Sequence, residues 1–354
     1  MDPSGAEHDA AIAIAALRDG HAIGAHHARA LGHALTQRLI NDAELGAFAM
    51  LLALQPPPVE TLADIARGVV ADSTGPVPGR VAWIADNAPT GSARHAIQRS
   101  ARSAAIDVVT VESIPVFERI AHSAGAASPT LTALRVVHET LAAGAAALLC
   151  DFHLDAALEL GAAQAAAESI VALAQHCGIA AHVRVFRLRA PLGCAFGPLL
   201  EATEAREISS GGGPVPLRVF VTNTLEHLAR LGKSEIAVVR PVAGVAPTDH
   251  AFAARKFLRA PMDGTVLRLD PAAIVTLARV AGGIRLLRTV GDEVQRGGVV
   301  LEVVGNDPAT VDRVAAAVAG AWTVGSGHRV APSAQPVAQF GAHATASETV
   351  PVLD

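Results

Sequence analysis

The feature that most constrains the fold is an alternation of strand-like and helical segments between residues 80 and 188. Apolar runs of strand length alternate there with segments in which apolar residues recur three and four positions apart. The strands are expected at 80–85, 106–111, 145–151 and 181–188, and the helices at 93–105, 130–142 and 156–176. Such alternation favours a largely parallel sheet with helices on its faces. The expected fold class is therefore α/β.

The regions on either side of this alternation have different patterns. Residues 7–70 show the apolar spacing of a small helical bundle. Residues 259–320 mix strand and helix patterns with glycine turns, which is typical of a compact α+β unit. The expected domains are a helical domain at 1–75 joined by 117–144, an α/β domain at 76–250, a C-terminal α+β domain at 251–323, and a flexible tail at 324–354.

Charge and hydropathy exclude several classes of protein. The chain has 28 Lys and Arg against 33 Asp and Glu, without the basic stripe that polymeric nucleic acid requires. No uninterrupted apolar run reaches about 18 residues, and the N-terminus lacks the pattern of a signal peptide. The three cysteines lie in apolar surroundings without metal-type spacing. We therefore expect a cytoplasmic protein that binds neither polymeric nucleic acid nor membranes.

Two separate regions carry a resemblance to a known family. The first is RAPLGCAFGPLLEATEAREISSGGGP at 189–214, and the second contains APMDG at 260–264 and VGDEV at 290–294. In order and spacing they resemble the class II nucleoside phosphorylases, which include the thymidine and pyrimidine-nucleoside phosphorylases. The segments AELGAFAMLLAL and ETLADIARGVVADS resemble the helical domain of that family. The resemblance covers most of residues 30–320.

The chain departs from the family where phosphate binds. The region between Asp72 and Ser128 is tens of residues shorter than the family norm, and the family's K-H-S-T-G-G loop is not recognisable. The chain therefore resembles a shortened and divergent member. The resemblance implies a homodimer with a small-molecule ligand in an interdomain cleft. It also implies glycosyl (pentosyl) transfer or phosphorolysis on a nucleoside- or nucleotide-like compound, other than thymidine or uridine.

Two further functions remain open. One is a non-catalytic ligand-binding or regulatory homologue that has lost the phosphate loop, because a fold does not fix a reaction. The other is a metal-assisted hydrolase or lyase that uses residues at the end of a strand.

The segment DNAPTGS at 86–92 is the candidate phosphate site. It follows an expected strand and precedes an expected helix, so backbone amides and hydroxyls can face an anion at the helix N-terminus. The alternative is a plain capped turn. The candidate ligands are Asp86, Asn87, Thr90, Gly91 and Ser92.

Asp151, His153 and Asp155 are the candidate catalytic residues. They follow an apolar run, and the two-residue period of a strand places all three side chains on one side. Open α/β sheets bind ligands at the carboxyl ends of their strands. The trio can transfer a proton or bind a metal ion. The alternative is helix capping by Asp155 beside a solvated His153.

A second group of candidate ligand residues lies on or near the expected helix at 130–142. Arg135 and Glu139 are four residues apart and share one face. The resemblance places them where the family reads the base, and places Ser113 and Arg119 near the ligand. Because Glu139 stands in place of a lysine, pyrimidine carbonyls become poor partners. The alternative for Arg135 and Glu139 is a surface ion pair.

The resemblance also implies a structural cation. Leu192, Ala195 and Glu204 match positions where some family members bind potassium or calcium through two backbone oxygens and one carboxylate. Hard cations accept such oxygen ligands. This ion and phosphate are the two groups that the resemblance suggests, and no other cofactor is expected.

Overall fold

A largely parallel sheet, sheet A, lies at the centre of the molecule. The computed structural model describes residues 3–70, 75–86, 91–111, 128–154, 160–187, 191–233, 252–327 and 336–341. Sheet A has the strand order β12-β4-β3-β1-β2, and only β12 is antiparallel to its neighbour. These strands are β1 (Val77–Asp86), β2 (Val108–Thr110), β3 (Ala145–Leu154), β4 (Ala180–Arg187) and β12 (Ala338–Gly341). The α/β class predicted from the alternation is confirmed.

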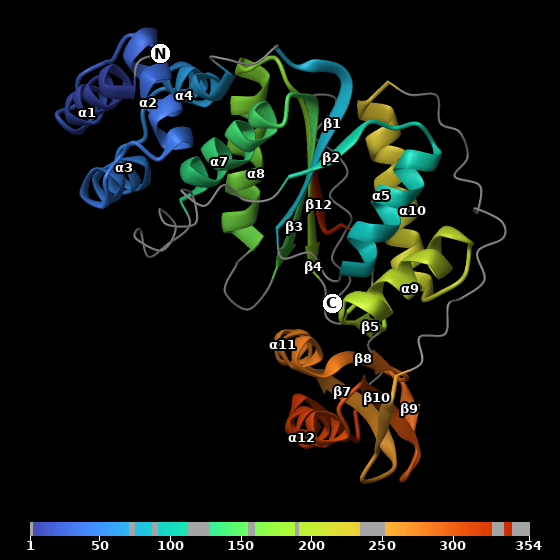
Figure 1. Ribbon diagram of the computed structural model, residues 1–354. Helices are drawn as coiled ribbons and strands as arrows, with labels where there is room; N and C mark the ends of the chain where they lie inside the picture. The colour runs from blue at the N-terminus through green and yellow to red at the C-terminus, as the bar shows by residue number, and fades with distance from the viewer. Residues whose placement is uncertain are drawn as a thin grey trace.

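Helices cover both faces of sheet A (Figure 1). One face packs against α7 (Pro129–Ala142) and α8 (Leu160–His176), and the other against α5 (Gly91–Ser103) and α10 (Val215–Leu231). Alternate residues of β3 therefore enter two different cores. Leu148 belongs to the core on the α8 side and Leu149 to the core on the α10 side. A strand buried on both faces explains the continuous apolar run in its sequence.

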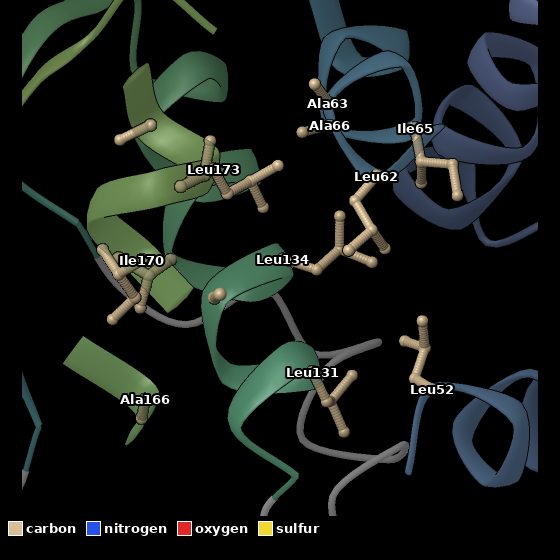
Figure 2. Close-up of a cluster of buried hydrophobic side chains, with 14 of the residues drawn as sticks. Leu52, Leu62, Ala63, Ile65, Ala66, Leu131, Leu134, Ala166, Ile170 and Leu173 are labelled. Atoms are coloured by element: carbon tan, nitrogen blue, oxygen red, sulfur yellow. The ribbon is translucent and has the colours of Figure 1, made fainter. Parts of the chain in front are cut away.

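The N-terminal helices lie beside α7 and α8, on the side away from the sheet (Figure 1). They are α1 (Pro3–Arg18), α2 (Ala25–Gln37), α3 (Asp42–Leu54) and α4 (Val59–Arg67), followed by a 3-10 turn at Gly68–Val70. Figure 2 shows Leu62 of α4 and Leu134 of α7 pointing toward each other within one apolar cluster. These helices therefore share a continuous core with one face of sheet A.

The C-terminal unit contains two small antiparallel sheets, with strand orders β5-β8-β10-β6 and β11-β7-β9. Strand β5 (Ala195–Phe196) comes from the segment before α9 (Pro198–Ser209) and pairs with β8, so this segment is tied to the C-terminal unit. The other elements are β6 (Ala254–Arg259), β7 (Gly264–Leu269), α11 (Pro271–Ala281), β8 (Gly282–Leu286), β9 (Glu293–Val294), β10 (Val299–Gly305), α12 (Pro308–Val318), the 3-10 turn Ala319–Ala321 and β11 (Trp322–Gly325).

The expectation of a flexible tail at 324–354 is wrong for its described part. Strand β11 continues to Gly325, and residues 338–341 form β12 at the edge of sheet A. Ala338 is buried in the adjoining core and Phe340 packs against it, while the backbone of β12 pairs with the edge of β4. Composition alone does not reveal such pairing. Residues 342–354 lie outside the described residues, and the predicted domain boundaries remain predictions.

The helices that the structure describes include none with the length and apolarity needed to cross a membrane.

Candidate functional site

The strand that carries Asp151 is longer than the sequence pattern indicates. Strand β3 was expected to end at Asp151, but its pairing with β4 continues to Leu154. Asp151 and His153 therefore lie within the sheet instead of following it, and Asp151 has no exposed surface. This corrects the expectation that both residues emerge at the edge of the sheet. Asp155 lies outside the described residues.

The Asp151 carboxylate is occupied by partners from the protein itself. Arg184 donates from Nε to Oδ1 at 2.7 Å and from Nη2 to Oδ2 at 2.8 Å, and Trp83 Nε1 donates to Oδ2 at 2.9 Å. Burial raises the pKa of Asp151, but the charge and hydrogen bonds of Arg184 and the hydrogen bond of Trp83 outweigh it. The pKa is therefore lowered overall. Asp151 is thus held as a buried, ionised and hydrogen-bonded group.

His153 lies in aromatic surroundings on the same face as Asp151. Its ring stacks on Phe186 with centroids 5.3 Å apart and lies 6.1 Å from the ring of Phe220 on α10. Arg184 also donates to Thr224 of α10 at 2.8 Å. The two-residue period therefore correctly placed Asp151 and His153 on one side. That side faces the helix α10.

The start of α5 meets the predicted cation residues. Gly91 and Ser92 open α5, and Ser92 is fully buried beside Glu204 of α9. Glu204 is 5% exposed, and its Oε1 accepts a hydrogen bond from the Cys194 amide at 2.7 Å. The structure thus brings two predicted groups together. One is the end of the predicted phosphate loop, and the other is the segment Leu192–Ala195 with Glu204.

Burial raises the pKa of Glu204, although the nearby Ser92 hydroxyl and the amides of Cys194 and Ala195 oppose the rise. The other predicted phosphate ligands are less well defined. Asp86 is the last residue of β1. Asn87 and Thr90 lie outside the described residues.

Glu201, which was not among the residues predicted from the sequence, adds a second carboxylate at this junction. Its Oε1 accepts from the Gly197 amide at 3.1 Å, and its Oε2 lies so close to Gly91 that a Cβ there would overlap it. Glu201 and Glu204 are one helical turn apart on α9 and face the positive end of the α5 dipole. The Glu-x-x-Glu spacing was the available signal.

These carboxylates determine what the end of α5 can bind. A phosphate placed directly against Gly91 would meet the negative charge of Glu201. The positive end of α5 is therefore already compensated by a carboxylate of the protein itself.

The predicted pair on α7 is present but is not at the surface. Arg135 Nη1 lies 3.6 Å from Glu139 Oε2, and Glu139 is only 1% exposed. The neighbouring His138 Nε2 lies 2.8 Å from Thr36 Oγ1 of α2, and burial lowers the pKa of His138 to about 4. The alternative of a solvated surface pair is therefore wrong for Glu139. Ser113 and Arg119 lie outside the described residues.

Within the described residues, no group of three or more His, Cys, Asp or Glu side chains is arranged to hold a metal ion. An open hollow in the C-terminal unit is lined by residues of β7, β9 and β10, with Arg288 nearby, and no predicted site residue lines it. It therefore adds nothing to the candidate site.

No protein-family model matches this chain, and no curated protein matches it at a significant level. The likeness to class II nucleoside phosphorylases therefore depends on the residues quoted for it above.

Proposed function

We propose that this chain carries out glycosyl (pentosyl) transfer or phosphorolysis on a nucleoside- or nucleotide-like small molecule, other than thymidine or uridine. The observation that carries the proposal is the contact between the start of α5 and the Leu192–Glu204 segment. The resemblance independently links these two segments to the ligand and the structural ion. Although about a hundred residues separate them in the chain, they meet where β1 ends and α5 begins.

The proposed chemistry needs negative charge near a sugar. Glycosyl transfer passes through an oxocarbenium-like centre, which fixed negative groups or a bound anion stabilise. In this proposal an acceptor phosphate binds the candidate phosphate segment, residues 86–92. It does not bind against Gly91, because Glu201 occupies that position. Arg135 and Glu139 are proposed to contact the base.

The same proposal includes a structural potassium or calcium ion at the junction. Glu204 would supply a carboxylate oxygen, and Leu192 and Ala195 would supply backbone oxygens. Glu201 provides further negative charge beside Gly91. A second carboxylate favours the doubly charged calcium ion over potassium.

The alternative is a non-catalytic ligand-binding or regulatory protein. One observation favours it, since Glu201 and Glu204 compensate the positive end of α5 that would otherwise attract phosphate. The metal-assisted hydrolase or lyase at Asp151, His153 and Asp155 is disfavoured. Both Asp151 oxygens already accept hydrogen bonds from Arg184 or Trp83.

We also propose that the protein is a cytoplasmic homodimer. Helix α3 presents a solvent-facing stripe of apolar side chains at helical spacing, Ala43, Ala47, Met50 and Leu54, of which Leu54 is 76% exposed. A second copy packed on this stripe would bury it, as the resemblance implies for the helical domain. Light scattering coupled to size-exclusion chromatography gives the mass that tests this point.

A turnover assay tests the enzymatic proposal. The purified protein is incubated in phosphate buffer with a panel of ribo- and deoxyribonucleosides and nucleotides, and the released base is measured by chromatography. We expect release from at least one compound and none from thymidine or uridine, even in a Glu139→Lys variant. Saturable binding without release of base would favour the non-catalytic alternative. Robust release from thymidine or uridine would contradict the position that the resemblance gives to Glu139 in base recognition.

A further inference from the structure

Two histidines outside the site described above lie against each other. The rings of His182 on β4 and His227 on α10 have centroids 4.8 Å apart and planes tilted by 37°. A third element joins them, because His182 Nε2 lies 3.1 Å from Oε1 of Gln339 on β12. Strand, helix and C-terminal strand therefore converge on two imidazole rings.

Hydrogen bonds determine which nitrogen of each ring carries the proton. His227 Nδ1 donates to the Asn223 carbonyl at 2.7 Å, so Nε2 carries the free lone pair. His182 Nε2 donates to Gln339 Oε1, which leaves the lone pair on Nδ1. Gly341 lies beside that nitrogen, and a Cβ there would come within 2.9 Å of it. Histidines that ligate metals usually donate their other N–H to an oxygen in this way.

Burial favours the neutral form of both rings. Burial, followed by the nearby His227, lowers the pKa of His182 to about 4, and burial also lowers the pKa of His227. Each side chain is only partly buried, so an ion can reach it with some of its water.

The charged groups around the pair nearly balance. Arg184 acts on both rings, but it is paired with Asp151, whose charge acts in the opposite direction. Arg230 acts on His227 and belongs to the exposed surface. An incoming cation therefore meets one uncompensated positive charge, and that charge is solvated.

We propose that His182 and His227 bind a divalent transition-metal ion of the zinc, nickel or copper class. Imidazole nitrogen suits these ions, and water completes the coordination of a site with two protein ligands. Gln339 orients His182 and belongs to β12. The bound ion therefore links α10 to β4, and through Gln339 it stabilises the pairing of β12 with β4. This site is independent of the proposed glycosyl site.

Calorimetry and hydrogen exchange on the full chain test the proposal. Zinc chloride or nickel chloride is titrated at pH 7 in a buffer that does not chelate metals. Separately, amide exchange of residues 338–341 is followed with and without zinc. We expect zinc to slow exchange in β12 of the wild type. His182→Ala and His227→Ala should each weaken zinc binding at this site at least tenfold and abolish the slowing.

A matched control separates this site from other histidines. His26 and His27 of α2 also make a ring contact, with centroids 5.5 Å apart, and of these two His26 is exposed and His27 is partly buried. The double variant His26→Ala/His27→Ala should keep the effect of zinc on β12. If His182→Ala does not fold, His227→Ala, on the partly exposed face of α10, decides the question. Zinc that leaves β12 exchange unchanged in the wild type, or acts equally in His227→Ala, overturns the proposal.

Discussion

Arg184 and Asp151 form a two-point ion pair inside sheet A, with side chains that are 1% and 0% exposed. They lie side by side on the neighbouring parallel strands β4 and β3. Trp83 on β1 donates to the same carboxylate, and Arg184 donates to Thr224 on α10. Three strands and a helix are therefore joined by one polar network in the middle of an apolar core.

Removing one partner of this pair should strongly destabilise the protein. Asp151→Ala leaves the Arg184 charge buried without its carboxylate, and should lower the free energy of unfolding by about 3–5 kcal/mol. Urea denaturation followed by circular dichroism measures the change. Asp107→Ala, which breaks the exposed pair with Arg80, should cost less than about 1 kcal/mol. Equal losses in the two variants would contradict the structural role of the buried pair.

The Asp151–Arg184 pair should also make the free energy of unfolding fall at low pH. The pKa of Asp151 is lowered in the fold, so its stabilising contribution is present above the pKa of an unfolded aspartate, about 3.9. The contribution is lost as the pH falls through the lower folded value.

His138 should make stability depend on pH in a higher window. Burial lowers its pKa from 6.5 to about 4, so the unfolded chain binds the proton first. Its contribution is complete above pH 6.5 and is lost as the pH falls toward 4, by up to about 3 kcal/mol. Denaturation at a series of pH values measures this loss. His138→Gln should flatten the profile in part, because His182 and His227 also have lowered pKa values.

Two glycines inside helices should respond oppositely to alanine. Gly32→Ala would place a Cβ onto the backbone carbonyl of Ile65 on α4 and force α2 and α4 apart, so the melting temperature should fall. Gly46 lies within α3 with no atom near its missing Cβ, so Gly46→Ala should stabilise by about 0.5–1 kcal/mol through helix propensity. Differential scanning fluorimetry compares the two. An unchanged melting temperature for Gly32→Ala would contradict the close approach of α2 and α4 at this position.

If the proposed structural ion binds, the melting temperature should depend on which cation is added. Adding calcium chloride should raise the melting temperature of the wild type by more than the same ionic strength of tetramethylammonium chloride, because an ion that binds only the folded state stabilises it. Glu204→Gln should remove the calcium-specific part, since it takes away the carboxylate charge. Glu302→Gln, which lies in the C-terminal unit and pairs with Arg255, should retain it. A calcium response that survives in Glu204→Gln would place the ion elsewhere.

The candidate site was predictable only in part. The resemblance pointed to Leu192, Ala195 and Glu204 as one cluster, and the strand-to-helix segment with Gly91 and Ser92 pointed to another. Nothing local indicated that the two clusters would touch, or that Glu201 would face Gly91. Likewise, the apolar run predicted a buried strand before Asp151, but the partner that keeps Asp151 buried lies on the next strand.

The sequence by itself determined the class of fold, because helical and strand periods are properties of neighbouring residues and depend on the spacing of side chains along the chain. Tertiary structure decided the extent of β3, the pairing of β12 with β4, the Asp151–Arg184 pair and the meeting of α5 with α9. Each of these joins segments far apart in the chain. Whether a carboxylate is solvated, paired or beside a helix end depends on which distant group lies against it. That is fixed only when the cores on the two faces of sheet A are packed.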